Sequence, residues 1–353
     1  KIDALFDPTI TAIIAISYFL SIFFGARMVV ADEISLGQLV TFTTYLGMMV
    51  WPLLALGWFF NLIERGKASY DRIDEIMNTK SDIGNTVTTD SVPSGDITFD
   101  ISEFVFPGED EVSLRDIHFT LREGETLGIV GRTGSGKSSI IRLLLREFDT
   151  SGSNTVSING TDIKQYDIKK LRRLFGYVPQ DNFLFSSTIR NNIAFTNPEI
   201  NTASVHRAAD LSYIHHDIEN FPEGYETVVG ERGVSLSGGQ KQRISIARAL
   251  ISDPEILILD DSLSAVDAET ETAILRNIEQ NRAGKTNIIT AHRMSAVRNA
   301  DLILVMENGR IVERGTHDSL TGARGWYYDT FKAQSLRRNL TKELDETLEG
   351  GGE

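Results

Sequence analysis

The sequence predicts a chain in two parts, α-helical membrane spans followed by an α/β domain with a phosphate-binding loop. Two long apolar stretches without charged side chains lie within residues 8–63. From Ile97 onward, short apolar runs typical of buried strands alternate with helical segments. One of these runs leads directly into a glycine-rich loop at residues 131–138.

The composition excludes several classes of function. At 353 residues, the chain is long enough for more than one domain. Its formal net charge of -14 argues against a nucleic-acid partner, because phosphate contacts require clustered Lys and Arg. It contains no cysteine, so disulfides and thiolate metal ligands are excluded for this sequence.

The first part is typical of a membrane hairpin in a lipid bilayer. Residues 8–26 and 36–63 are uncharged, and each is close to the roughly 20 apolar residues that a helix needs to cross a bilayer. The second stretch contains Trp51 and Trp58. A pair of buried core helices is the alternative, but two such stretches in tandem favour spans at about residues 8–29 and 36–63.

Charge and turn residues predict how the rest of the chain is organised. Three cations follow the second span, namely Arg65, Lys67 and Arg72, which favours the cytoplasmic side for that end. We expect a membrane part with a connecting helix at 1–84, a turn-rich linker at 85–96, an α/β domain at 97–335 and an acidic tail at 336–353, with disorder over residues 341–353.

The glycine-rich loop is the first site motif. The buried strand "TLGIVG" (126–131) runs into "GRTGSGKS" (131–138), which fits G-x-x-x-x-G-K-[ST] and precedes a helical run. Glycines let backbone N–H groups approach a phosphate closely, Lys137 would reach the β and γ phosphates, and Ser138 would bind Mg²⁺. The expected nucleotide-binding residues are Gly131, Thr133, Gly134, Ser135, Gly136, Lys137, Ser138 and Ser139.

Polar side chains follow three further predicted strands. The run "ILILDD" ends in Asp260, a candidate Mg²⁺ ligand, and Asp261, a candidate base for the attacking water. Gln180 follows "FGYVP" and could reach metal or water, and His292 follows "TNIITA" and could contact the γ-phosphate. A solvated acid or a structural histidine is the alternative, but ligands of open α/β sheets bind at these strand ends.

A second anion-binding motif is "LSGGQ" (236–240), which opens a helical segment. A helix N-terminus with glycines attracts anions, although a simple Ser-Gly turn with an N-cap is the alternative. The residues concerned are Ser237, Gly238, Gly239 and Gln240.

These motifs together resemble the ATP-binding cassette (ABC) family. Further agreement comes from "YVPQDNFLFSSTIRNNIAF" (177–195), "SAVD" (264–267) and "TAHR" (290–293). Fused to a membrane hairpin, the chain looks like the C-terminal part of an ABC exporter half-transporter of the bacterial multidrug type. The resemblance implies an ABC cassette with antiparallel β and helical subdomains, ATP and Mg²⁺ as cofactors, and a place in the cytoplasmic membrane. It also implies that Phe106 in "FVFPG" stacks on adenine.

The resemblance also implies a partner subunit. Such cassettes dimerise head to tail, so Ser237 and Gly239 would contact the γ-phosphate held by the other subunit. Half-transporters of this kind have six spans, and the two spans here would be the fifth and sixth. The cargo would be a hydrophobic or amphipathic compound.

One residue departs from the family pattern. The second acid after the strand is normally glutamate, and Asp261 is shorter by one C–C bond, about 1.5 Å. The resemblance to heterodimeric exporters of the family then implies a heterodimer in which this chain binds MgATP at a slow site. Its LSGGQ motif (236–240), here called the signature, would complete the partner's site. The alternative is a homodimeric exporter of lipid or peptide in which Asp261 is a competent base.

Other classes that share these motifs fit less well. DNA-repair ATPases would need a long coiled coil, a zinc hook or a basic face, and importer ATPases lack fused spans. A purely regulatory binding module would tolerate loss of Lys137 or Asp260, and the sequence keeps both.

Overall fold

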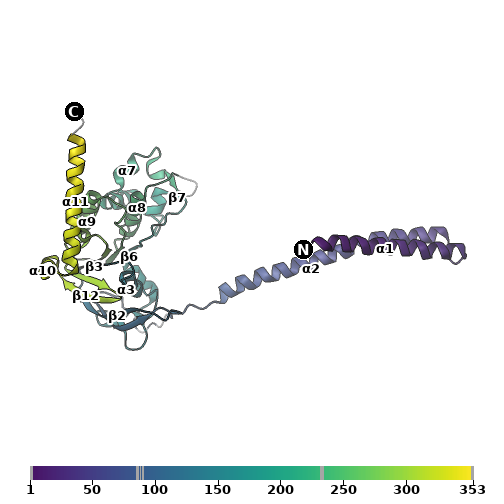
Figure 1. Ribbon diagram of the computed structural model, residues 1–353, viewed down its shortest axis with the longest axis horizontal. Coiled ribbons are helices and arrows are strands. Elements are labelled where there is room, and N and C mark those ends of the chain that lie inside the picture. The colour runs from purple at the N-terminus through teal and green to yellow at the C-terminus, as the bar shows by residue number, and fades with distance from the viewer. Residues whose placement is uncertain (1–2, 85–86, 88, 90, 231–233, 351–353) are drawn as a thin grey trace. The chain divides into compact units, whose positions relative to one another are not determined.

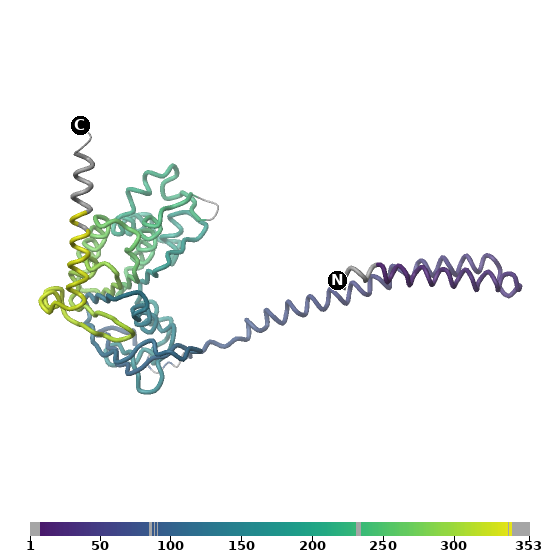
Figure 2. Tube along the Cα trace, viewed as in Figure 1, coloured from purple at the N-terminus to yellow at the C-terminus, as the bar shows by residue number. Residues whose placement is uncertain are grey.

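The computed structural model describes residues 3–84, 87, 89, 91–230 and 234–350. It separates into two compact units, Lys1–Asp82 and Ile83–Glu353. Figure 1 shows the elements of each unit, and Figure 2 follows the same chain as a continuous trace.

The first unit consists of two long helices, α1 (Asp3–Val30) and α2 (Leu36–Asn78), which lie side by side (Figure 1). Ser35 begins α2 with a capping box. Its hydroxyl accepts from the Gln38 amide at 3.2 Å, and the Gln38 side chain accepts from the Ser35 amide at 2.7 Å. The expected connecting helix is not a separate element, because α2 continues without a break to Asn78.

Both helices are long and apolar enough to cross a membrane. No described residue of α2 is buried, and large apolar side chains such as Phe19 of α1 and Phe60 of α2 are exposed. The helices approach each other at two glycines: a Cβ at Gly25 would meet Leu39, and a Cβ at Gly47 would meet the Tyr18 hydroxyl. A helix pair that is apolar on all sides requires lipid or further helices around it.

The second unit is built around a six-stranded sheet with the order β12-β11-β3-β10-β9-β6. The pairings are parallel except for β12, which pairs antiparallel with β11. The parallel strands therefore end at one common edge of the sheet. The strands are β3 (Thr126–Gly131), β6 (Phe175–Val178), β9 (Ile256–Asp260), β10 (Thr286–Ala291), β11 (Leu302–Glu307) and β12 (Arg310–Gly315).

An antiparallel sheet and a helical region complete this unit, as expected for the fold class. The sheet has the order β2-β1-β4-β5, with β1 (Ile97–Val105), β2 (Val112–Leu121), β4 (Thr155–Ile158) and β5 (Thr161–Asp162). A short pair joins β7 (Ser187–Thr188) to β8 (Val228–Val229). The helices are α3 (Lys137–Leu144), α4 (Ile168–Arg173), α5 (Ile189–Ile193), α6 (Thr202–Leu211), α7 (His215–Glu219), α8 (Gly238–Leu250), α9 (Ala268–Asn281), α10 (His317–Ala323) and α11 (Trp326–Gly350), with 3-10 turns η1 (Ile163–Gln165), η2 (Gly224–Glu226) and η3 (Met294–Val297).

Strand β9 shows how the core is divided. Ile256 and Ile258 pack into the cluster shared with the antiparallel sheet and α3, whereas Leu257 and Leu259 pack into the cluster on the opposite face. Successive side chains of a strand point to opposite faces, so a strand covered on both faces is apolar throughout. This packing fixes the position of the two aspartates that end the run.

The prediction of disorder over residues 341–353 is wrong for residues 341–350, which the structure describes as helix. Helix α11 begins at Trp326 and continues to Gly350. The physical reason is that Leu, Glu and Lys in this segment are good helix formers, and extending an existing helix avoids the cost of nucleation. Residues 351–353 lie outside the described part of the chain.

Candidate active site

The glycine-rich loop connects the end of β3 to the start of α3. Gly134 and Gly136 have φ values of 78° and 101°, which favour glycine. A Cβ at Gly131 would collide with the Met306 carbonyl oxygen and the Ser135 hydroxyl. The loop therefore needs glycine for its shape, and it leaves backbone N–H groups at the N-terminus of α3, where anions are favoured.

Lys137, the first residue of α3, lies over this loop. Its ammonium group donates hydrogen bonds to the carbonyl oxygens of Gly131 and Arg132, both at 3.0 Å. Burial lowers the pKa of the Lys137 side chain, while the negative charges of Asp261 and Asp260 oppose this effect. The Lys137 ammonium is thus a positive charge held against the backbone carbonyls of the loop.

Asp260 ends β9 and is 4% exposed. It accepts hydrogen bonds from Thr290 Oγ1 at 2.6 Å and Ser138 Oγ at 3.2 Å. The structure thus brings together the hydroxyl and the carboxylate that the sequence predicts as Mg²⁺ ligands. Among the described residues, no group of three or more His, Cys, Asp or Glu side chains could hold a metal alone. Such a group is not required for Mg²⁺, which usually takes only one or two ligands from the protein and the others from substrate phosphates and water.

Asp261 has a left-handed backbone, with φ of 47°. Its amide donates to the Thr290 carbonyl at 3.1 Å and to the Thr290 hydroxyl at 2.9 Å, which fixes its backbone beside β10. The carboxylate lies 3.9 Å from Nε2 of His292, so the two are close but not hydrogen-bonded. Burial raises the pKa of the Asp261 carboxyl, against the opposing effects of His292 and Lys137.

These groups line one cleft of about 460 Å³. It contains residues from the loop and from three strand ends, as expected from the parallel topology. The predicted site residues that line it are Thr133, Gly134, Ser135, Gly136, Lys137, Ser138, Ser139, Gln180, Asp260, Asp261 and His292.

Phe106 is a predicted site residue that does not line this cleft. Its ring packs edge-on against Phe104 and Phe148, with centroid distances of 5.0 and 4.9 Å. The Arg142 guanidinium lies 5.7 Å from the ring centroid. The proposed adenine contact therefore remains a prediction.

The signature residues lie elsewhere in the unit, at the start of α8. The Ser237 hydroxyl accepts from the Gln240 amide at 3.2 Å, and the Gln240 side chain accepts from the Ser237 amide at 3.1 Å. Ser237 and Gly238 are exposed, and none of the residues from Ser237 to Gln240 lines the phosphate-loop cleft. The helix N-terminus is thus presented to the exterior of this chain.

Three residues that help to build the site are not among its predicted residues. Thr290 holds both aspartates because β10 pairs with β9 in a register that places it opposite Asp260. The β11–β12 turn, Asn308 and Gly309, also lines the cleft, and the Gly309 amide donates to the Ser135 carbonyl at 3.0 Å. An Asn-Gly pair between two apolar runs predicts a hairpin by itself, but the place of this hairpin beside the loop depends on how β11 pairs with β3.

Comparisons with known proteins agree with this architecture. Residues 114–264 match the family described as ABC transporter, and residues 1–53 match the ABC transporter transmembrane region. The probable multidrug resistance ABC transporter ATP-binding/permease protein YheI of Bacillus subtilis (strain 168) is 48% identical over 336 residues, 95% of this chain and 57% of YheI. The multidrug resistance-like ATP-binding protein MdlA of Escherichia coli (strain K12) is 45% identical over 96% of this chain and 58% of its own length.

A solved structure is also similar. A bacterial Atm1-family ABC exporter with ATP bound matches with a TM-score of 0.76 and 33% identity, over 94% of this chain and 58% of that chain. The chain therefore spans somewhat more than half the length of these relatives. It is a membrane protein with its ATP-binding domain in the cytoplasm, and it combines an ABC transporter transmembrane region with an ABC transporter ATP-binding domain.

Proposed function

We propose that this chain is one subunit of an ATP-driven exporter of hydrophobic or amphipathic compounds. Its own phosphate loop binds MgATP at a slow site, and its signature completes the site of a partner subunit. The observation that carries the proposal is the separation of two halves of an ATP site, a cleft with Lys137 and Asp260 and an exposed signature at Ser237.

The cleft suits the triphosphate of MgATP. Three features favour anions there: the loop amides, the N-terminus of α3 and the positive charge of Lys137. In this role, Lys137 would exchange its carbonyl partners for β- and γ-phosphate oxygens. Ser138 and Asp260 would hold Mg²⁺ with Gln180, and His292 would contact the γ-phosphate.

A second chain would supply further hydrogen-bond donors for the γ-phosphate. Ser237 and Gly239 lie at the exposed N-terminus of α8, where the helix dipole favours an anion. A head-to-tail dimer would place them on the γ-phosphate of the partner's nucleotide. The same arrangement would bring the partner's signature to the cleft of this chain.

Hydrolysis at this chain's own loop would be slow because of Asp261. An aspartate reaches about 1.5 Å less far than a glutamate, and a misplacement of about 1 Å can lower a rate on the order of 100-fold. A slow site of this kind is useful only if the partner's site turns over, so we favour a heterodimer. A homodimer with a competent base is the second candidate, supported by the inward position of Asp261 beside His292.

The cargo follows from the membrane part and from the relatives. The spans carry apolar side chains on every side, and YheI and MdlA have names that indicate multidrug resistance. Hydrophobic or amphipathic compounds are therefore the substrate class that fits this chain best.

Vesicles containing the complete transporter test the proposed function. In inside-out vesicles, external MgATP should be hydrolysed and should drive uptake of a fluorescent amphipathic dye, because the ATP-binding domain faces outward there. Sealed right-side-out vesicles are the control and should do neither. Equal dye uptake with MgADP and MgATP in inside-out vesicles would contradict the proposal.

A further inference from the structure

Helix α11 holds the backbone on both sides of Arg293. Gln334 Nε2 donates a hydrogen bond to the His292 carbonyl at 2.8 Å, and the Met294 amide donates to Gln334 Oε1 at 2.9 Å. A primary amide can donate and accept at the same time, so one half-buried side chain satisfies both backbone groups.

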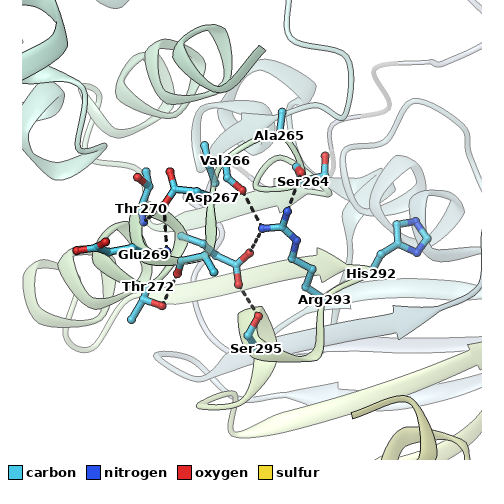
Figure 3. Close-up of polar contacts among 12 residues, drawn as sticks. Ser264, Ala265, Val266, Asp267, Glu269, Thr270, Thr272, His292, Arg293 and Ser295 are labelled. Atoms are coloured by element: carbon cyan, nitrogen blue, oxygen red, sulfur yellow. Dashed lines mark hydrogen bonds and ion pairs between the residues drawn. The ribbon is translucent and has the colours of Figure 1, made fainter. Parts of the chain in front are cut away.

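Two side chains of the same segment, Arg293 and Ser295, are held by residues outside α11. The Arg293 guanidinium donates to the Val266 carbonyl at 2.8 Å and the Ser264 carbonyl at 3.1 Å, and it pairs with Glu271 at 2.9 Å. The Ser295 hydroxyl donates to Glu271 at 2.6 Å, and that carboxylate is almost fully buried. Figure 3 shows that the imidazole of His292 points away from the Arg293 guanidinium. His292 therefore projects from a segment whose backbone is held by Gln334 and whose neighbouring side chains are held by Glu271 and the 264–266 carbonyls.

The packing of helix α11 against the domain fixes the position of Gln334. Tyr327, Phe331 and Gln334 are spaced i, i+4 and i+7, so they lie on one face of α11. Tyr327 is fully buried, and its hydroxyl lies 2.9 Å from Nδ1 of His317. Phe331 packs against the core cluster that contains Met294. This anchored face carries Gln334 to the backbone of the histidine segment.

We propose that Gln334 is a positioning residue, which sets the place of His292 in the nucleotide cleft. The C-terminal helix α11 thereby controls hydrolysis at this chain's site, although it does not line the cleft. The inference rests on the proposed function, since His292 has a role there only if the cleft hydrolyses ATP. Loss of the Gln334 contacts should let His292 move without changing the phosphate loop.

Three variants of the complete transporter separate this role from a general effect on folding. Gln334→Met keeps the length and removes both hydrogen bonds. Gln334→Glu keeps the acceptor for the Met294 amide and loses the donor to His292. Lys332→Met is the matched control, because Lys332 is an exposed residue on the same helix that lies over the Tyr328 ring.

Hydrogen exchange at the Met294 amide gives a readout that does not depend on activity. Gln334→Met should accelerate exchange in peptides covering residues 290–297, while Gln334→Glu and Lys332→Met should leave it close to the parent rate. An unchanged exchange rate in Gln334→Met would overturn the proposal.

ATPase rates give the second readout. Every variant carries Asp261→Glu, so that the short base does not limit this site, and Gly239→Asp, so that turnover at the partner's site does not mask it. Gln334→Met should lower kcat about tenfold with little change in KM for ATP, because a small displacement of a reacting group costs rate more than binding. Gln334→Glu should fall between Gln334→Met and the parent. In a His292→Ala background, Gln334→Met should have no further effect.

Two outcomes distinguish failure of the positioning role from failure of the proposed function. An equal loss from Gln334→Met with and without His292 would mean that Gln334 acts on the structure generally, which overturns the positioning role. Absence of MgATP hydrolysis in the parent and in Asp261→Glu, with normal exchange protection at Met294, would instead refute the proposed function.

Discussion

Replacing Gly239 with aspartate should lower steady-state ATP hydrolysis by the complete transporter about 100-fold or more. The new carboxylate would stand at the N-terminus of α8, against the γ-phosphate of the partner's nucleotide. An acidic residue in the first turn does not disfavour the helix, so the effect should fall on the site and leave the fold intact. Hydrolysis of MgATP by the purified, reconstituted transporter measures it.

Gly239→Asn is the matched control for this prediction. Both substitutions add a Cβ, which would lie 3.0 Å from the Ala265 carbonyl oxygen and would require a small local shift. Only the aspartate adds charge, so the asparagine variant should keep about ten times more activity than the aspartate variant. Equal loss in the two variants would show that shape, and not repulsion of the phosphate, explains the effect.

Replacing Lys137 with alanine should weaken MgATP binding to this chain about tenfold or more. The substitution removes the charged donor, now bonded to the Gly131 and Arg132 carbonyls, that we propose binds the β and γ phosphates. Hydrogen bonds to charged groups contribute about 1.5–3 kcal/mol each. Photolabelling of this subunit within the complete transporter, over a range of azido-ATP concentrations, measures the affinity at this site alone.

Arg132→Ala serves as the control for Lys137→Ala. Arg132 belongs to the same loop and carries the same charge, but its side chain is exposed and does not line the cleft. Its loss should change the affinity little. If the two variants weaken labelling equally, general charge accounts for binding and the phosphate assignment of Lys137 is wrong.

The sequence predicts the strand ends of the site well, and the physical reason is local. A buried strand between two packed layers is apolar on both faces, so the polar residue after it marks the edge of the sheet. This places Asp260 and Asp261 after β9 and His292 after β10. Parallel pairing then brings these ends together, as the structure confirms.

Contacts between distant elements could not be predicted in the same way. Thr290 holds Asp260 and Asp261 because β10 pairs with β9 in one register, and spacing along the chain does not specify register. The contact of Gln334 with the histidine segment depends on a helix that begins far from the motifs. The acidic composition of residues 341–353 indicates disorder, whereas the local helix propensity of residues 341–350 prevails in the structure.

The ratio of two ATPase rates tests the central claim most directly, namely that this chain has a slow site and lends its signature to a faster one. Asp261→Asn removes the base of this chain's own site, and Gly239→Asp blocks the site completed by its signature. In the reconstituted transporter, we expect Asp261→Asn to keep about half or more of the parent ATPase rate, while Gly239→Asp is nearly inactive. If Asp261→Asn is as inactive as Gly239→Asp, both sites depend on Asp261 and the heterodimer account is wrong.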